Sequence, residues 1–318
     1  MSKHVPVLLQ EVIANLNIKD SGVYVDCTLG GGGYFEMLIE NLNRFAKGSL
    51  LIGLDQDMDS IKAYVEKTKK DYGVEIKEEE LEIEYLKVKA FKYKIGKTEI
   101  VLVNSNFTNI EELVALLKKD KKVLGIVADL GFSSDQLNNS RGFSFRNIND
   151  ELDMRMDVRN TVKAKDILNA FGEKELANIF REYADEPRSR IVAEEILKIR
   201  EKSKFEKVND LLKVLDSIKG IFDREDFYQR IFQALRIAVN SELDSLKTLL
   251  TASLNVVDKG GRVLFVSFHS GEDRLVNNFI ISINLISVSE KEITPTPKEI
   301  LKNPRSRSAK LRGFIKNN

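Results

Sequence analysis

The stretch that decides the fold is Val23-Tyr-Val-Asp26-Cys-Thr-Leu-Gly30-Gly-Gly-Gly33, in which a short apolar strand runs directly into four glycines. A second apolar strand follows and ends in an acid, Leu50-Leu-Ile-Gly-Leu-Asp55. Glycines at a strand-to-helix turn let the backbone approach a ligand that any Cβ atom would block. An acid about twenty residues further on, at the tip of the neighbouring strand, is placed to bind two ribose hydroxyls. The two strands therefore predict a pocket for an adenosine-containing cofactor.

The spacing of the glycines distinguishes between such cofactors. A dinucleotide enzyme needs a third glycine where the helix packs on the strand, as in G-x-G-x-x-G. Here Gly30 and Gly32 are followed at that position by Phe35, so the turn suits a smaller ligand without a pyrophosphate. S-adenosylmethionine is the favoured ligand, with a dinucleotide or a loop that binds no ligand as the alternatives.

The composition is that of a globular protein of 318 residues, with 42% hydrophobic residues, 31% charged residues and a net charge of +1. This charge gives no global sign of a nucleic-acid partner, so any such surface must be local. The single cysteine, Cys27, excludes an intrachain disulfide, and with only two histidines a structural zinc site is not expected. No signal pattern and no run of membrane-spanning length is found, so we expect a cytoplasmic protein.

Strands and helices alternate near both ends of the chain and enclose a helical block. Buried strands are expected at 23–27, 50–55, 100–103, 123–129 and 260–268, and helices at 34–45 and 58–70. Residues 74–95 alternate apolar and charged side chains, which predicts a hairpin. Several amphipathic helices are expected within 161–219, and one long helix at about 228–256. Three prolines in the last 24 residues suggest an extended end. Core strands on both sides of a helical block indicate an insertion.

Two residues at predicted strand ends could carry chemistry. Asp129 ends the strand 123–129, and ligands of open α/β sheets bind at the carboxyl ends of strands. Its carboxylate could hold an ammonium group or accept a proton from a substrate amine, although such an acid also serves as a cap or turn residue. His269 follows the strand 260–268, where a histidine is usually a structural residue.

Two segments combine basic and aromatic or apolar residues in a way that fits RNA. Arg141-Gly-Phe-Ser-Phe-Arg146 and Leu152-Asp-Met-Arg-Met-Asp157 supply Arg141, Phe143 and Arg155 as candidates, because arginine contacts phosphate and aromatic faces stack on unpaired bases. The alternative is a linker folded on the core by its own Phe and Met side chains. The run 303–312 is strongly basic and offers Arg305 and Arg307 to phosphates, unless it is simply solvated.

Taken together, these segments resemble the RsmH (MraW) family, methyltransferases that modify N4 of a cytidine in small-subunit ribosomal RNA near the decoding site. The resemblance covers nearly the whole chain. Its segments begin with His4-Val-Pro-Val-Leu-Leu, Tyr24-Val-Asp-Cys-Thr-Leu-Gly-Gly-Gly-Gly33, Asp55-Gln-Asp57, Asp129-Leu-Gly-Phe-Ser-Ser and Gln136-Leu. They continue with Arg141-Gly-Phe-Ser-Phe, Leu152-Asp-Met-Arg-Met-Asp157, Phe232-Gln-Ala-Leu-Arg, Ser267-Phe-His-Ser270 and 303–312.

The resemblance implies a class I (Rossmann-like) α/β methyltransferase fold, a mostly parallel sheet with an inserted all-helical domain. It places the methyltransferase domain at 1–137 and 226–318, and the helical substrate-recognition domain at 138–225. The implied S-adenosyl-L-methionine contacts are Gly32, Gly33, Tyr34, Asp55, Phe107, Asp129 and Gln136. It also implies catalytic roles for Asp129 near the reacting amine and for His269 as an RNA contact or proton acceptor. The implied partner is small-subunit ribosomal RNA or the small ribosomal subunit, and a homodimer is one expectation for the assembly.

Several places depart from the family pattern, including a residue that directly follows the four glycines. Tyr34 stands where the family usually has histidine, 226–229 reads Asp-Phe-Tyr-Gln in place of His-Pro-Ala-Thr, and Gly271 replaces a leucine. These positions are expected on the RNA side or at the cofactor rim. Two alternatives therefore accompany the prediction: a methyltransferase of the same fold that acts on another RNA, and a non-catalytic ribosome assembly factor that binds cofactor and RNA.

Overall fold

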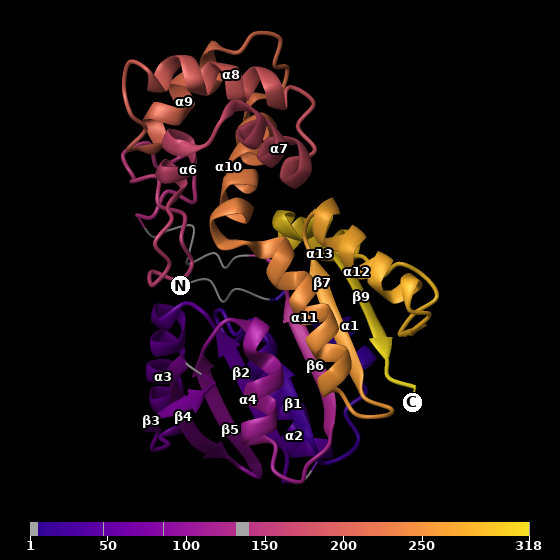
Figure 1. Ribbon diagram of the computed structural model, residues 1–318. Helices are drawn as coiled ribbons and strands as arrows, with labels where there is room; N and C mark the ends of the chain where they lie inside the picture. The colour runs from indigo at the N-terminus through magenta and orange to yellow at the C-terminus, as the bar shows by residue number, and fades with distance from the viewer. Residues whose placement is uncertain (1–5, 47, 85, 132–139, 318) are drawn as a thin grey trace. The chain divides into compact units, whose positions relative to one another are not determined.

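The computed structural model describes residues 6–46, 48–84, 86–131 and 140–317 (Figure 1). The chain divides into two compact units, the first formed by Met1–Gly131 with Asp244–Asn318 and the second by Phe132–Leu243. The predicted domain boundaries at 137/138 and 225/226 lie at other positions than these. No helix in the described part of the chain is long and apolar enough to cross a membrane.

The first unit is built on a sheet whose nine strands in the described ranges run in the order β3-β4-β5-β2-β1-β6-β7-β9-β8. The central strands β5, β2, β1, β6 and β7 are parallel, while β9 runs antiparallel to β7 and β4 runs antiparallel to β5. The strands are β1 (Val23–Asp26), β2 (Leu50–Asp55), β3 (Lys77–Ile83), β4 (Leu86–Ile95), β5 (Thr98–Asn104), β6 (Val123–Asp129), β7 (Arg262–Ser267), β8 (Ile286–Ser287) and β9 (Lys310–Ile315).

Helices cover both faces of this sheet, as Figure 1 shows. One face packs on α1 (Leu9–Leu16), α2 (Gly33–Phe45) and α3 (Met58–Tyr72), and the other on α4 (Ile110–Leu117), α11 (Glu242–Val256) and α12 (Ser270–Ser282). The central strands are buried on both faces, which explains their almost unbroken apolar sequences. The remaining elements of this unit are η1 (Phe107–Asn109), α13 (Pro297–Lys302) and η2 (Pro304–Ser308).

The second unit is helical and has a hydrophobic core of its own. Its helices are α6 (Ala164–Ala170), α7 (Glu173–Ala184), α8 (Ser189–Arg200), α9 (Val208–Ser217) and α10 (Arg224–Asn240). Phe180, Phe205 and Phe227 are among its completely buried side chains. The unit lies between β6 and β7 in the sequence, so the predicted fold class, a mostly parallel α/β sheet with an inserted all-helical region, is confirmed.

The predictions of one long helix and of an extended end were wrong, and the prediction of a hairpin is confirmed. The predicted long helix at 228–256 is two helices, because Ser241 adopts a left-handed conformation with φ of 50° and ends α10. The predicted extended end instead forms α13, η2 and the core strand β9, since Thr296 caps α13 and Pro297 occupies its first turn. The hairpin predicted within 74–95 is present as β3 and β4.

Candidate active site at the carboxyl edge of the sheet

Four polar side chains stand at the carboxyl ends of neighbouring parallel strands. Asp26, Asp55, Asn104 and Asp129 are the last residues of β1, β2, β5 and β6. Asp55 is in register with Asn104, whose side-chain amide donates to the backbone oxygens of Asp55 and Gln56 at 3.0 and 3.1 Å. Open α/β sheets bind ligands at this edge, so these strand ends define the candidate site.

The glycine turn is tied directly to the tip of β2. The amide of Gly30 donates to Oδ2 of Asp55 at 2.8 Å, and the amide of Asp57 donates to Oδ1 of the same carboxylate at 2.8 Å. Burial raises the pKa of Asp55 to about 6, although these two amide bonds oppose the rise. Asp55 therefore fixes the turn, and each of its oxygens keeps a further lone pair for a ligand hydroxyl.

The glycines of the turn serve different purposes. A Cβ atom on Gly32, whose φ is 78°, would lie 2.1 Å from the ring of Tyr64, and one on Gly33 would lie 2.1 Å from the ring of Pro6. At Gly31, by contrast, a Cβ atom would meet no protein atom within 4 Å. Gly32 and Gly33 thus make room for the protein's own side chains, whereas the space beside Gly31 is open.

Asp26 is a buried acid of the site for which the sequence motif predicted no role. Its residue is 1% exposed, and its Oδ1 accepts a bond from the amide of Thr28 at 3.0 Å. Its Oδ2 is buried and has no hydrogen-bond partner among the described residues. Burial raises its pKa to about 7, and the charge of Asp55 adds to the rise. The available signal was an acid at the end of the strand that leads into the glycines.

Asp129 has a similar environment. Its amide donates to Oγ1 of Thr28 at 2.7 Å, and its Oδ1 is buried without a partner within the described ranges. Burial raises the pKa of Asp129 well above its ordinary value, and the charges of Asp26 and Glu272 raise it further. Two buried carboxyl groups that lack a cationic partner among the described side chains favour a positively charged ligand.

His269 caps α12, which is the structural role left open by the sequence. Its Nδ1 accepts a bond from the amide of Glu272 at 3.4 Å, while Oε2 of Glu272 accepts from the amide of Phe268 at 2.9 Å. Its Nε2 lies 3.2 Å from Oε1 of Glu272 but is not in hydrogen-bond geometry with any described residue. The capping contact accounts for Nδ1, and Nε2 is buried.

The other predicted cofactor residues differ in their placement. Tyr34 is 4% exposed, and its hydroxyl donates to the backbone oxygen of Val7. Phe107 is half-buried at the start of η1, shortly after the end of β5, and packs against the core. Gln136 lies outside the described residues.

The predicted RNA residues of the helical unit are engaged within that unit. The Arg141 guanidinium donates to the backbone oxygens of Arg155 and Met156 at 3.0 and 3.1 Å, and Phe143 is buried in the core. Arg155 binds both carboxylate oxygens of Asp153, at 2.7 and 2.8 Å. Burial alone would raise the pKa of Asp153, but the bonds to Arg155 outweigh it and hold the pKa below its usual value. These contacts favour the alternative of a linker folded on its own core.

The basic run near the carboxyl end divides into two parts. Arg305 and Arg307 are exposed on η2. Lys310 and Arg312, further along in β9, both bind Asp273, and the closer contact, from Nε of Arg312, is 2.5 Å. Within the described part of the run, Arg305 and Arg307 are exposed and stay predictions for an RNA contact, whereas Lys310 and Arg312 pair with Asp273.

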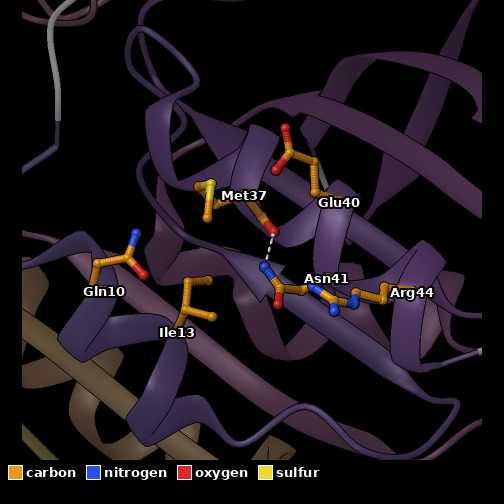
Figure 2. Close-up of a pocket in the computed structure, with 6 residues that line it drawn as sticks. All are labelled: Gln10, Ile13, Met37, Glu40, Asn41 and Arg44. Atoms are coloured by element: carbon orange, nitrogen blue, oxygen red, sulfur yellow. Dashed lines mark hydrogen bonds between the residues drawn. The ribbon is translucent and has the colours of Figure 1, made fainter.

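A cavity of about 280 Å³ lies elsewhere in the first unit, between α1 and α2 (Figure 2). It is lined by Gln10, Ile13, Met37, Glu40, Asn41 and Arg44. In Figure 2 the side-chain amide of Asn41 donates to the backbone oxygen of Met37, at 2.8 Å, within its own helix. None of the lining residues belongs to the carboxyl edge, so the strand ends, and not this cavity, define the candidate site.

Comparison with known proteins agrees with the resemblance. A family model described as the MraW methylase family matches residues 1–317. A protein of Dictyoglomus thermophilum named "Ribosomal RNA small subunit methyltransferase H" is 38% identical, over 98% of this chain and 96% of its own length. Proteins of the same name from Clostridium botulinum (strain Loch Maree / Type A3) and Parabacteroides distasonis are 37% and 35% identical, over 98% and 97% of this chain and 97% and 96% of their own lengths. The chain therefore belongs to the MraW methylase family.

Proposed function

We propose that this protein transfers a methyl group from S-adenosyl-L-methionine to N4 of a cytidine in small-subunit ribosomal RNA, near the decoding site. The observation that carries the proposal is the match of the methylase family over residues 1–317, with relatives named for small-subunit ribosomal RNA. The substrate assigns the protein to the cytoplasm, where ribosomes are assembled.

The residues at the carboxyl edge fit this cofactor. The ribose would lie at Asp55, and the open space beside Gly31 lets the backbone of the turn approach the ligand. The unpartnered oxygens of Asp26 and Asp129 match the ammonium group of the methionine part. When bound, S-adenosylmethionine supplies an activated methyl group on a positively charged sulfur.

Asp129 would orient the amine that receives the methyl group. The lone pair of the cytosine amine is delocalised into the ring, so the site must hold the amine close and turned toward the methyl carbon. Such positioning supplies several kcal/mol of the barrier, up to roughly 7–11 in well-aligned systems. The carboxylate of Asp129 would stabilise the positive charge that develops on the amine nitrogen and would accept its proton.

The charge state of Asp129 follows from its surroundings. Burial and its acidic neighbours raise the pKa of Asp129, so the carboxyl group holds a proton more readily than an exposed acid. The positive charge of the cofactor offsets this effect and favours the ionised form, which can accept a hydrogen bond from the amine. The target base must leave its stack to reach such a site.

Labelled methyl transfer tests the proposal. Wild-type protein, Asp129→Asn and Asp258→Asn are incubated with methyl-labelled S-adenosylmethionine and small ribosomal subunits that lack the modification. Asp258 is the control acid, since its Oδ2 accepts from the amide of Val123 at 2.7 Å at the opposite end of β6. We expect label in the ribosomal RNA with wild type and Asp258→Asn, and a loss of about a hundredfold or more with Asp129→Asn.

Three results would contradict the proposal in different ways. Label in another RNA, with none in the small subunit, would assign the same chemistry to another substrate. Cofactor binding without any transfer would favour a non-catalytic assembly factor. Full activity of Asp129→Asn would remove that residue from the reaction.

A further inference from the structure

Residues Pro6–Leu8, here called the N-terminal strap, lie against the glycine turn. The ring of Pro6 occupies the place of the missing side chain of Gly33, because a Cβ atom there would lie 2.1, 2.8 and 3.5 Å from three ring carbons. Pro6 itself is buried. The strap thus contacts the first residue of α2, directly after the turn that faces the proposed cofactor.

Two hydrogen bonds hold the strap from different sides. The hydroxyl of Tyr34, the second residue of α2, donates to the backbone oxygen of Val7. The amide of Leu8 donates to Oε1 of Glu299 on α13 at 2.7 Å. Val7 and Leu8 are 3% and 0% exposed; the bond from Tyr34 is buried, and the bond to Glu299 is partly buried. Segments from the start, the first third and the end of the chain therefore converge on the strap.

The surroundings of the Tyr34 hydroxyl keep it protonated, so that it can donate to the backbone oxygen of Val7. Burial raises the pKa of Tyr34 well above its ordinary value, and the negative charges of Asp129, Asp26 and Glu299 raise it further. The hydroxyl therefore keeps its proton. The strap therefore uses the polar atom of Tyr34.

We propose that Tyr34 is a positioning residue, which latches the N-terminal strap onto Gly33 and so holds the glycine turn in the conformation that binds the cofactor. Among the described residues the turn is held by amide bonds from Leu29 to the backbone oxygen of Leu54, from Gly30 to Asp55 and from Gly32 to the backbone oxygen of Leu29, at 2.9, 2.8 and 2.7 Å. Gly33 has no side chain of its own to restrict it, so the ring of Pro6 supplies that restriction.

The positioning role of Tyr34 rests on the proposed function, in which the turn binds S-adenosylmethionine. A pair of tyrosine variants tests this role. Tyr34→Phe removes only the hydroxyl. Tyr24→Phe is the matched control, because Tyr24 is also a buried tyrosine whose hydroxyl donates to a backbone oxygen, that of Asp20, at 3.0 Å. S-adenosylmethionine affinity is measured by calorimetry, and hydrogen exchange is followed in the peptide that contains Leu8.

We expect Tyr34→Phe to weaken S-adenosylmethionine binding by about fivefold to tenfold, the size of one lost hydrogen bond, and to speed exchange in the strap. Tyr24→Phe should leave both unchanged. Glu299→Gln, which weakens the second tie, should shift both readouts in the same direction as Tyr34→Phe, and it covers the case in which Tyr34→Phe fails to fold.

Other results would contradict the positioning role proposed for Tyr34. Wild-type affinity in Tyr34→Phe, or the same loss in Tyr24→Phe, would show that the hydroxyl stabilises the fold without positioning the turn. If the wild type binds S-adenosylmethionine and only the variant comparison fails, the latch is wrong and the proposed function stands. If the wild type itself does not bind, both are wrong.

Discussion

Single residues of the glycine turn meet two separate demands, packing and ligand approach. Gly32 and Gly33 leave room for Tyr64 and Pro6, whereas the space beside Gly31 is open. A run of four glycines does not reveal this division, because the side chains that fill two of the positions come from distant parts of the sequence. The sequence predicted Asp55 and Asp129 at strand ends, but not that Thr28 donates to Asp26 and accepts from Asp129.

Alanine at Gly31 and alanine at Gly32 should impair different properties, cofactor binding in the first case and stability in the second. Gly31→Ala should fold normally and weaken S-adenosylmethionine binding, since its methyl group enters the space assigned to the ligand. Gly32→Ala should lower the free energy of unfolding by about 2–4 kcal/mol, because it combines an unfavourable φ with a clash against Tyr64. Urea unfolding and calorimetry measure the two effects, and normal binding by Gly31→Ala would contradict the assignment.

The pH dependence of stability should show the burial of Asp26. Its pKa is about 7 in the folded protein and about 4 in the unfolded chain, so folding takes up a proton between these values. The free energy of unfolding of the ligand-free protein should therefore fall as pH rises from about 4 to about 7. Asp26→Asn should reduce this slope, and Asp258→Asn should not. Equal slopes for wild type and Asp26→Asn in urea unfolding would refute the prediction.

The ionisation of Asp26 should also change the affinity for the cofactor. A positively charged ligand binds the ionised carboxylate, so S-adenosylmethionine affinity should rise between pH 6 and pH 8, a range that spans the pKa of Asp26 at about 7. Calorimetry in buffers of different ionisation enthalpy should detect proton release on binding, and Asp26→Asn should diminish that release. Proton uptake instead of release would rule out the assigned charge.

At the scale of elements, hydrophobic periodicity located the central strands, the hairpin and most helices but missed β8, β9 and the break after α10. Apolar residues continue at helical spacing across Ser241, so the sequence reads as one helix, and the turn depends on a single left-handed residue with φ of 50°. Similarly, prolines indicated an extended end, yet Pro297 lies in the first turn of α13. Proline excludes a helix interior but favours a first turn, so its presence alone cannot distinguish the two.

Glycine at the break and glycine inside the following helix should change the free energy of unfolding in opposite directions. Ser241→Gly should raise the free energy of unfolding by about 0.5–1 kcal/mol, because glycine adopts the left-handed region without a steric penalty. Ser245→Gly, within α11, should lower it by about the same amount, because glycine weakens a helix interior. A loss of stability in both variants, measured by urea unfolding, would show that Ser241 is not strained.

For the whole molecule, the interrupted alternation of strands and helices was enough to predict an inserted helical region, but not its limits. The predicted boundary at 225/226 falls just inside α10, whereas the helical unit extends to Leu243. Phe227, Ile231 and Leu235 of α10 are buried in the core of the helical unit. An amphipathic pattern shows that a helix has a buried face, but it does not show which of two cores receives that face.

The same limit applies to the predicted RNA contacts. Arg141, Phe143 and Arg155 have the residue types that bind RNA, yet each is held inside the helical unit. A sequence shows which residue types are present but not which partners they contact, so an arginine bonded within its own unit cannot be told from one that faces solvent. Arg305 and Arg307, which are exposed, remain predictions for the RNA surface.

The identity of the methylated atom tests the central claim most directly. Small ribosomal subunits that lack the modification are treated with wild-type protein and S-adenosylmethionine, and the ribosomal RNA is digested and mapped by mass spectrometry, with Asp129→Asn as the parallel control. We predict one new N4-methylcytidine near the decoding site with wild type and none with Asp129→Asn. A methyl group on a different base or at a different position, or none in the small-subunit RNA, would contradict the account.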